Sequence, residues 1–430
     1  MKINTQRYIV VIEGMKTSLT ETLNRLKNDH PEYEDVKFLL LSQTADSLHD
    51  LGNEVTVLQT DYSAESLKNI FDDATVSVIA VLCRGDKYVQ YLRKVLPYFP
   101  PTVRVASSKS LEITTNKRMM RQAFEQYAPE ITPGYLKVTD AEEETLQSVS
   151  ARLKYPVIVK PASLASSLMI QRCNDEESLR TVLSEVFSKL ETIYSAEGRA
   201  EPAEVIVEEF LVGSFYSIDA YSMQSGDVYY TPIIEYLPAE SMGINDFFLY
   251  KRWTDTRLSR SEVLAAQATV RKSIEAVGLE HSSVHAELVR TKDGWKIIEI
   301  GPRIGRFRNI MYKSAFGIDH GYNDLLIHLG IKPLLTMSNK TLNYVAAYSI
   351  YPTKEGILKE IHGLDMIEKN IPTLNYLNIG NSKTGEYVRF ARNGGHALAE
   401  IVFSCETKAE YDIACKWFDE NVFAIVEGSE

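Results

Sequence analysis

Glu287 and Glu299 are two carboxylates in neighbouring strand-like segments, Val284–Arg290 and Trp295–Ile300, which are joined by a tight turn. A three-residue loop with Gly294 in the left-handed conformation places the two glutamates directly opposite each other, whereas a two-residue Asp-Gly loop places them on opposite faces. The three-residue loop also keeps the alternating aliphatic residues on one face, and we therefore predict it. Two carboxylates that face each other repel. The pair is stable if a divalent cation lies between them, so it indicates a metal site.

Strand alternation divides the residues of this hairpin between two faces. We expect the following pairs each to share a face: His285 with Glu287, Ala286 with Leu288, Ile297 with Glu299, and Ile298 with Ile300.

A cationic turn follows the second glutamate. The segment Pro302–Lys313 contains four basic residues and no acid, in a chain with a net charge of −11; the four are Arg303, Arg306, Arg308 and Lys313. Mg²⁺ is commonly held by one or two carboxylates together with the phosphates of a substrate. The segment therefore indicates a metal–phosphate site. Arg306 and Arg308 could each form a bidentate pair with a substrate carboxylate. The alternative is an ordinary hairpin with solvated glutamates and surface arginines.

Composition excludes several other classes of protein. A chain of 430 residues with 44% hydrophobic and 24% charged residues is typical of a globular protein with two to four domains. Its acidic balance argues against a nucleic-acid or membrane surface. Its four cysteines form no CxxC pair, so neither a disulfide framework nor a zinc site is indicated. Without an apolar run of 18 residues or a signal-peptide pattern, we expect a cytoplasmic protein.

The first part of the chain alternates between strand and helix patterns, which is typical of a doubly wound parallel sheet. We predict an N-terminal α/β domain at residues 1–108. The predicted strands are Tyr8–Ile12, Val36–Leu41, Val55–Leu58, Val76–Leu82 and Val103–Ala106, and the predicted helices are Thr17–Lys27, Ser63–Phe71 and Lys87–Leu96. The first strand is not followed by a GxGxxG motif, so we predict no dinucleotide site there.

The segments that follow contain two lysines in notable places. Lys117 lies near the start of a helix predicted over Ser107–Ala128, and Lys160 ends the apolar strand Tyr155–Lys160. The loop Ala162–Leu168, which contains Ser167, is rich in small residues and could bring backbone N–H groups close to phosphate oxygens. The strand Glu204–Leu211 then ends in two acids, Glu208 and Glu209. A helix over Ser261–Val277 precedes the hairpin. Beyond Pro333, strands Asn343–Tyr351 and Ala397–Ser404 and helix Lys408–Asn421 indicate a small α+β unit.

Taken in order, these elements resemble the ATP-grasp superfamily over roughly residues 1–335, and Glu299-Ile300-Gly301-Pro302-Arg303 is similar to its E-x-N-x-R signature. The C-terminal unit resembles that of the carboxylate–amine ligase branch related to biotin carboxylase and carbamoyl-phosphate synthetase. The resemblance implies an ATP-grasp domain at 109–335, a lid at about 136–212, and a C-terminal subdomain at 336–430.

The resemblance also implies roles for single residues. Lys117, Lys160 and Ser167 would contact the ATP phosphates, while Glu208, Glu209 and the backbone near Leu211 would hold the adenine. Glu287 and Glu299 would bind two Mg²⁺ ions, with Mn²⁺ as the alternative metal, and Arg303 would stabilise the transferring phosphoryl group. His285 would orient substrate or support the fold.

The sequence departs from the family pattern at three places. Gly301 replaces the asparagine of the signature, Leu164, Ser166 and Met169 occupy glycine positions of the lid loop, and Phe215 stands where a glutamate usually binds the ribose.

The function implied is an ATP-dependent ligase that joins a small carboxylate, such as an amino acid or small peptide, to an amine through an acyl phosphate. Its expected partners are small molecules and a second copy of the chain in a homodimer. The first alternative is a nucleotide-binding regulatory protein with little turnover, which the missing lid glycines and Gly301 favour. The second is a biotin-type or carbamate-forming carboxylase, against which the glycine-poor loop and the lack of a carrier domain argue.

Overall fold

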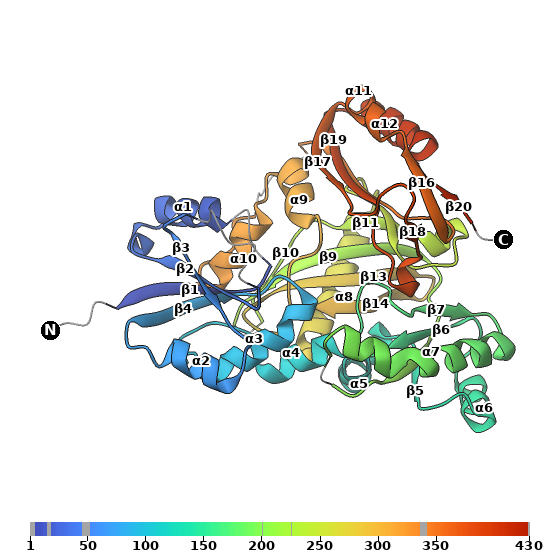
Figure 1. Ribbon diagram of the computed structural model, residues 1–430, viewed down its shortest axis with the longest axis horizontal. Coiled ribbons are helices and arrows are strands. Elements are labelled where there is room, and N and C mark those ends of the chain that lie inside the picture. The colour runs from blue at the N-terminus through green and yellow to red at the C-terminus, as the bar shows by residue number, and fades with distance from the viewer. Residues whose placement is uncertain are drawn as a thin grey trace.

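The structure is a computed structural model that describes residues 5–14, 19–44, 52–199, 201–224, 226–335 and 342–428. Its elements form four sheets (Figure 1). In the first sheet, β1 (Gln6–Ile12) pairs in parallel with β2 (Lys37–Ser42) and β4 (Val76–Leu82), and β3 (Val55–Gln59) extends it beyond β2. The predicted parallel sheet is therefore confirmed.

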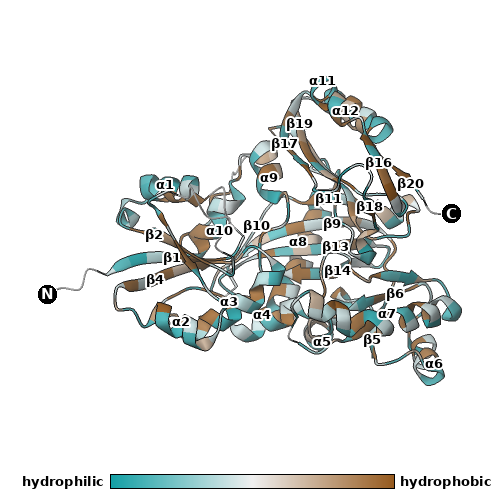
Figure 2. Cartoon of the chain, in the orientation of Figure 1, coloured by the Kyte–Doolittle hydropathy of each residue, from teal (hydrophilic) through white to brown (hydrophobic). Residues whose placement is uncertain are grey.

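Helices lie on both faces of this sheet, as a doubly wound fold requires. Two separate clusters of buried residues cover the faces, one of which includes the late helix α10. The helices are α1 (Leu19–Asp29), α2 (Ala64–Phe71), α3 (Val89–Val95) and α10 (His320–His328). Figure 2 shows hydrophilic residues on the outer helices and hydrophobic residues along β4. The predicted strand Val103–Ala106 is irregular, and the first two residues of the predicted helix Thr17–Lys27 lie outside the described residues.

A nine-stranded sheet occupies the centre of the molecule, with the order β14-β13-β9-β11-β12-β15-β19-β17 and with β10 paired to β9. Its strands are β9 (Ser214–Ser222), β10 (Val228–Tyr230), β11 (Ile234–Pro238), β12 (Leu249–Trp253), β13 (Ser282–Thr291), β14 (Gly294–Gly301), β15 (Tyr344–Ile350), β17 (Thr373–Ile379) and β19 (Ala399–Cys405). One face packs on α5 (Lys117–Tyr127) and α8 (Arg260–Val277) through a large hydrophobic core.

A third sheet has the order β5-β8-β6-β7 and its own hydrophobic core. It consists of β5 (Tyr135–Val138), β6 (Val157–Pro161), β7 (Gln171–Cys173) and β8 (Val205–Glu209), with helices α6 (Glu143–Arg152) and α7 (Glu176–Ala196). This lid sheet lies beside the central sheet and faces β13 and β14 (Figure 1). Its separate core shows that this sheet and its two helices pack as a unit of their own.

The last part of the chain extends the central sheet through β15, β17 and β19 and adds a small sheet. The small sheet contains β16 (Gly356–His362), β18 (Tyr387–Val388) and β20 (Phe423–Glu427), and helix α12 (Lys408–Asn421) covers this region. Among the described residues, no helix combines the length and the apolar character that a membrane crossing needs.

The hairpin β13–β14 places Glu287 directly opposite Glu299, as predicted, but by another route. Thr291 pairs with Gly294, so the turn has two residues rather than three, and the register changes by one between Glu287 and Leu288. This shift is a β-bulge that leaves Ile298 unpaired. Ile297 and Ile300 consequently both enter the core, whereas Ile298 lies on the cavity side with Glu299. The predicted facing of the second strand was wrong because the bulge interrupts alternation.

Gly213 joins the lid sheet to the central sheet at a point with no room for a side chain. A Cβ atom at this position would lie 2.2 Å from the carbonyl oxygen of Arg290. We expect Gly213→Ala to destabilise the protein by about 1–3 kcal/mol, because overpacking forces the backbone to move. The midpoint of thermal unfolding measures this, with Gly428→Ala, where the nearest atom is 3.7 Å away, as the control. An equal midpoint in both variants would contradict the prediction.

Candidate active site

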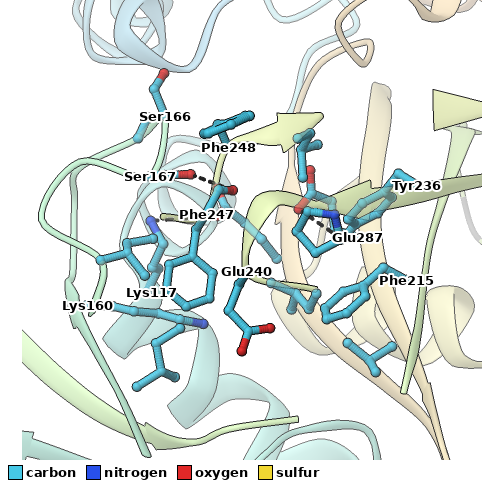
Figure 3. A pocket seen from close by; sticks show the side chains of 18 of the residues that line it. Lys117, Lys160, Ser166, Ser167, Phe215, Tyr236, Glu240, Phe247, Phe248 and Glu287 are labelled. Carbon is cyan, nitrogen blue, oxygen red and sulfur yellow. Dashed lines mark hydrogen bonds and ion pairs between the residues drawn. The ribbon is translucent and has the colours of Figure 1, made fainter. Parts of the chain in front are cut away.

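A cavity of about 290 Å³ lies between the lid sheet and the central sheet. Of the twelve predicted site residues, eleven line it, and Arg308 is the exception. The eleven are Lys117, Lys160, Ser167, Glu208, Glu209, Leu211, His285, Glu287, Glu299, Arg303 and Arg306. Figure 3 shows Lys117 and Lys160 on one side of the cavity and Phe215, Tyr236 and Glu287 on the other. Residues that are far apart in the sequence therefore meet in one place.

The glutamate pair is partly accessible from this cavity, since the side chains of Glu287 and Glu299 are 25% and 34% exposed. The Nζ atom of Lys117 lies 3.6 Å from Glu299. Burial raises the pKa of Glu287, but His285 and Arg303 outweigh it and lower this pKa to about 2. Glu287 is therefore ionised at neutral pH. The hydroxyl of Tyr236 donates a hydrogen bond of 3.4 Å to it.

The described residues contain no group of three or more His, Cys, Asp and Glu side chains arranged for a metal ion. A cation between Glu287 and Glu299 would therefore complete its shell with oxygens from a ligand and from water. This fits Mg²⁺, which retains water and shares few protein carboxylates. Gly301, in contrast, supplies no side-chain oxygen at the end of β14.

His285 is held by a buried polar network beneath the glutamates. Its Nδ1 atom lies 2.6 Å from Asp219, and its Nε2 atom lies 3.4 Å from Glu287. Asp219 also contacts His320 Nε2 at 2.6 Å and accepts from the backbone N–H of Gly305 at 2.7 Å. Burial lowers the pKa of His285, but Asp219 more than offsets it and the pKa is raised. The network fixes the imidazole and the start of the cationic turn together.

Lys117 owes its position to a break in the predicted helix Ser107–Ala128. The structure divides this helix at Asn116 into α4 (Ser108–Thr115) and α5, and the Asn116 side chain caps α5 by accepting from the N–H of Met119 at 3.0 Å. Lys117 is thus the first residue of α5, and its Nζ donates to the carbonyl of Leu164 at 2.6 Å. Its ammonium group lies between the lid loop and Glu299.

Glu208 lies in a buried ion cluster with two cations, where it is 1% exposed. It accepts from Arg121 Nε at 2.7 Å and from Lys160 Nζ at 2.7 Å. Burial raises the pKa of Glu208, but the two cations reverse this and lower it to about 2. Both of its oxygens accept hydrogen bonds from these cations, and the carboxylate also lines the cavity. Its expected contact with adenine stays a prediction.

Arg121 is a site residue that the sequence reasoning missed. It lies four residues after Lys117 and therefore on the same face of α5. That spacing was the available signal. Its Nη2 donates to the carbonyl of Ile298, the bulge residue, at 2.6 Å, so it connects the lid strand β8 to β14.

Arg303 meets a second missed residue, Asp86, which comes from the segment after β4. Its Nε donates to Asp86 at 2.9 Å, and its Nη2 also bonds this carboxylate. Burial raises the pKa of Asp86, but Arg303 outweighs this and lowers it. No sequence pattern indicated this contact, which spans 217 positions.

The lid loop adopts backbone conformations that glycine favours, although it contains no glycine. Ser166, Ser167 and Met169 have φ angles of +58°, +62° and +60°. Two of these are among the three positions where the family pattern has glycine. Ser167 Oγ donates to the carbonyl of Phe247 at 3.1 Å (Figure 3), and the N–H of Met169 donates to the carbonyl of Arg392 at 2.9 Å. The loop is therefore docked against both neighbouring segments.

The two arginines predicted as substrate ligands lie in different environments. Arg306 lines the cavity, is 63% exposed at its side chain, and pairs with Glu400 of β19. Arg308 is 1% exposed and donates to Ser217 Oγ at 2.6 Å. The expected contact of Arg308 with substrate is not supported, because it begins α9 (Arg308–Phe316) and points into the interior. Strand β12 and the segment before it contribute Phe247, Phe248, Leu249 and Arg252 to the wall of the cavity.

Comparison with known proteins finds similar chains. Residues 153–309 match the family model described as an ATP-grasp domain. The chain is 26% identical over 340 residues to the D-alanine–D-alanine ligase of Bacillus velezensis, covering 73% of this chain and 90% of that protein. It is 26% identical over 262 residues to the uncharacterized protein y4rH of Sinorhizobium fredii. This match covers 60% of this chain and 50% of that protein.

Among solved structures, the L-amino acid ligase from Bacillus licheniformis superposes with a TM-score of 0.73 at 17% identity, covering 100% of both chains. At this identity the match shows the fold.

The buried Glu208 cluster makes a pH-dependent contribution to stability. Its pKa of about 2 in the folded protein lies below the value of 4.5 for a free glutamate, so the contribution is present above pH 4.5 and is lost as the pH falls toward 2. Glu208→Gln should destabilise the protein by about 3–5 kcal/mol at pH 7, since Arg121 and Lys160 lose their partner. The difference in unfolding midpoint from the wild type should shrink between pH 4.5 and pH 3. A difference that does not change with pH would contradict this.

Proposed function

We propose that the chain, which matches an ATP-grasp domain over residues 153–309, is an ATP-dependent carboxylate–amine ligase that acts on amino acids or small peptides. The observation that carries the proposal is the opposed pair Glu287 and Glu299 in one cavity with Lys117 and Arg303. This set neutralises phosphate charge and provides no nucleophile of its own. Reactions of this kind depend on positioning and charge stabilisation.

The residues present fit ATP and Mg²⁺. Glu287 and Glu299 would hold two Mg²⁺ ions, or Mn²⁺ in their place, which would neutralise the phosphates. Lys117 is the best placed lysine for a phosphate, because its ammonium group lies close to Glu299. Lys160 supports the phosphate side through Glu208, and Ser167 brings the lid loop over it. The backbone from Glu209 to Leu211 would receive the adenine.

The reaction then follows in two balanced steps. A carboxylate oxygen of the acid substrate attacks the γ-phosphorus of ATP, and ADP leaves, which gives an acyl phosphate. The amine nitrogen attacks the carbonyl carbon, phosphate leaves, and the nitrogen loses a proton to form the amide. In this proposal Arg303, held by Asp86, would stabilise the phosphoryl group in transfer, while His285, held by Asp219, lies beside Glu287.

The substrate class rests on the relatives. One is named a D-alanine–D-alanine ligase and the structural neighbour an L-amino acid ligase. Both names describe the joining of amino acids. The predicted divisions at 1–108, 109–335 and 336–430, the lid at 136–212 and the homodimer remain part of this proposal.

A nucleotide-binding regulatory protein with little turnover is the second candidate. Gly301 supplies no metal ligand, and the lid loop holds three non-glycine residues at positive φ. Release of ADP on addition of amino-acid pairs separates the two functions, since the regulatory protein would bind nucleotide without consuming it.

The glutamate pair provides the direct test of the ligase. Glu299→Gln keeps the shape of the side chain but removes a charge and a strong oxygen ligand for the metal. We expect ATP turnover to fall by about 100-fold or more, because neutralisation of the phosphates is weakened. Stability of the metal-free protein should change little, because a like-charge contact and the contact with Lys117 are lost together. Turnover near the wild-type rate would contradict the site assignment.

Closure of the lid provides a second test. The lid loop touches Phe247 and Arg392 through single hydrogen bonds, and Arg172 of β7 pairs with Glu240. We expect hydrogen exchange of residues 162–173 to slow when Mg²⁺ and a non-hydrolysable ATP analogue are added, because closed lids exclude water. Helix α12 serves as an internal control that should not change. Equal exchange in the lid with and without nucleotide would contradict closure.

A further inference from the structure

Six lysines and arginines line the cavity, and five of them have a carboxylate partner. Arg252 is the exception, since it forms no ion pair with any described residue. The paired residues are Lys117 with Glu299, Arg121 and Lys160 with Glu208, Arg303 with Asp86, and Arg306 with Glu400. A buried charge is normally paired, because its removal from water is costly. The unpaired Arg252 therefore indicates that a bound ligand supplies its negatively charged partner.

Arg252 is 7% exposed, and its direct contacts are with neutral groups. Its Nη1 donates to the carbonyl of Leu249 at 3.2 Å and to Ser349 Oγ at 3.1 Å. Its guanidinium lies over the ring of Phe307 at 5.3 Å. Burial, followed by the charges of Arg308 and Arg306, lowers the pKa of Arg252 to about 9. The surroundings therefore hold an excess of positive charge.

The charge balance of this region confirms that excess. Three arginines, Arg252, Arg306 and Arg308, influence one another, and Glu400 is the only described carboxylate that forms an ion pair with any of them. Glu287 attracts Arg252 over a longer distance. The proposed metal ions would neutralise the charge of Glu287. An anion bound here would relieve the repulsion between the guanidinium groups.

Arg252 lies on the cavity face of the central sheet but away from the metal pair. It is directly opposite Tyr236 in the β11–β12 ladder, so their side chains share a face. Tyr236 in turn donates to Glu287. The strand order places β12 three strands from β13, which corresponds to about 14 Å between strand axes. The phosphate-side lysines come instead from α5 and the lid strand β6.

The surroundings of Arg252 suit a small organic anion better than a polyphosphate. The rings of Phe248 and Tyr351, both in the cavity wall, stack at 4.4 Å. The hydroxyl of Ser349 accepts from Arg252 and still has a proton to donate. A guanidinium and a neighbouring hydroxyl can bind both oxygens of a planar carboxylate.

We propose that Arg252 and Ser349 bind a substrate carboxylate that does not react, so that the protein selects a substrate pair with an anionic group beyond the one that is phosphorylated. This inference rests on the proposed ligase function and narrows its substrate class. The carboxylate has two possible sources. One is the α-carboxylate of an amino acid that supplies the amine, and the other is the side-chain carboxylate of an acidic amino acid.

Isosteric substrates distinguish these sources. Amide formation is measured with ATP, Mg²⁺ and pairwise mixtures of amino acids, and the productive pair is then repeated with neutral analogues. To test the side-chain carboxylate, asparagine replaces aspartate and glutamine replaces glutamate. To test the α-carboxylate, the amino acid that supplies the amine is replaced by its α-carboxamide. In one of these two comparisons, the wild type should have a KM for the charged substrate that is lower than the KM for its neutral analogue by about tenfold or more.

Arg252→Gln should abolish that preference. KM for the charged member should rise by about 10- to 100-fold, as loss of a charge-assisted contact predicts, while KM for the neutral analogue and for ATP should stay within about twofold. Ser349→Ala, which removes one hydroxyl and leaves the arginine, should show a smaller change in the same direction if Arg252→Gln fails to fold. Lys251→Gln is the matched control, because Lys251 is the preceding residue of β12 and pairs with Asp419 outside the cavity.

Three results would overturn the inference. An equal rise in KM for ATP in Arg252→Gln would show that Arg252 binds a phosphate. Unchanged discrimination in both Arg252→Gln and Ser349→Ala would place the anion elsewhere. A wild type that forms amides but does not distinguish the charged members from the neutral ones would remove the basis for a carboxylate site. Failure of the wild type to form any amide would instead refute the proposed function, and the inference with it.

Discussion

The like-charge contact between Glu287 and Glu299 is the constraint on which the site depends. Two carboxylates across a hairpin are unfavourable unless cations surround them. Lys117 lies near Glu299, and His285 near Glu287, while Arg303 contributes from the following turn. These cations offset the repulsion within the pair, and the proposed metal would bind by competing with them. Lys117 contacts Glu299 at 3.6 Å rather than at hydrogen-bond distance, which leaves the glutamate free to change partner.

The cations are held in turn by carboxylates from different sheets. Asp86 from the N-terminal part fixes Arg303, Glu208 of the lid sheet fixes Lys160, and Glu400 of the C-terminal strands fixes Arg306. Two of these pairs, Asp86 with Arg303 and Glu400 with Arg306, cross from one part of the molecule to another, whereas Lys160 and Glu208 belong to the same sheet. The cavity is therefore complete only when the sheets are docked. Movement of the lid sheet would carry Lys160 and Glu208 together, because the two belong to adjacent strands of that sheet. Arg121 is the link that connects them to β14.

The sequence was sufficient for the parts of the site that depend on local pattern. Alternation and apolar runs located the strands that carry Lys160, Glu208 and Glu287, and eleven predicted residues do line one cavity. It was insufficient where geometry depends on a single backbone event or on a distant partner. The bulge at Ile298 rotates the last residues of β14, and Asp86, the carboxylate partner of Arg303, lies 217 positions away. Glu208 showed no local sign that Arg121 and Lys160 would occupy both of its oxygens.

The lid loop shows how the chain tolerates residues where glycine would be easier. A side chain at positive φ costs free energy, of the order of 1 kcal/mol for each residue. Ser166, Ser167 and Met169 together therefore weaken the conformation seen here, and they persist because the carbonyls of Phe247 and Arg392 accept hydrogen bonds from the loop. Loss of those two contacts would release the strain at once. The docked loop is consequently less stable than a glycine-rich loop of the same shape would be, so its closure depends more strongly on what the cavity contains.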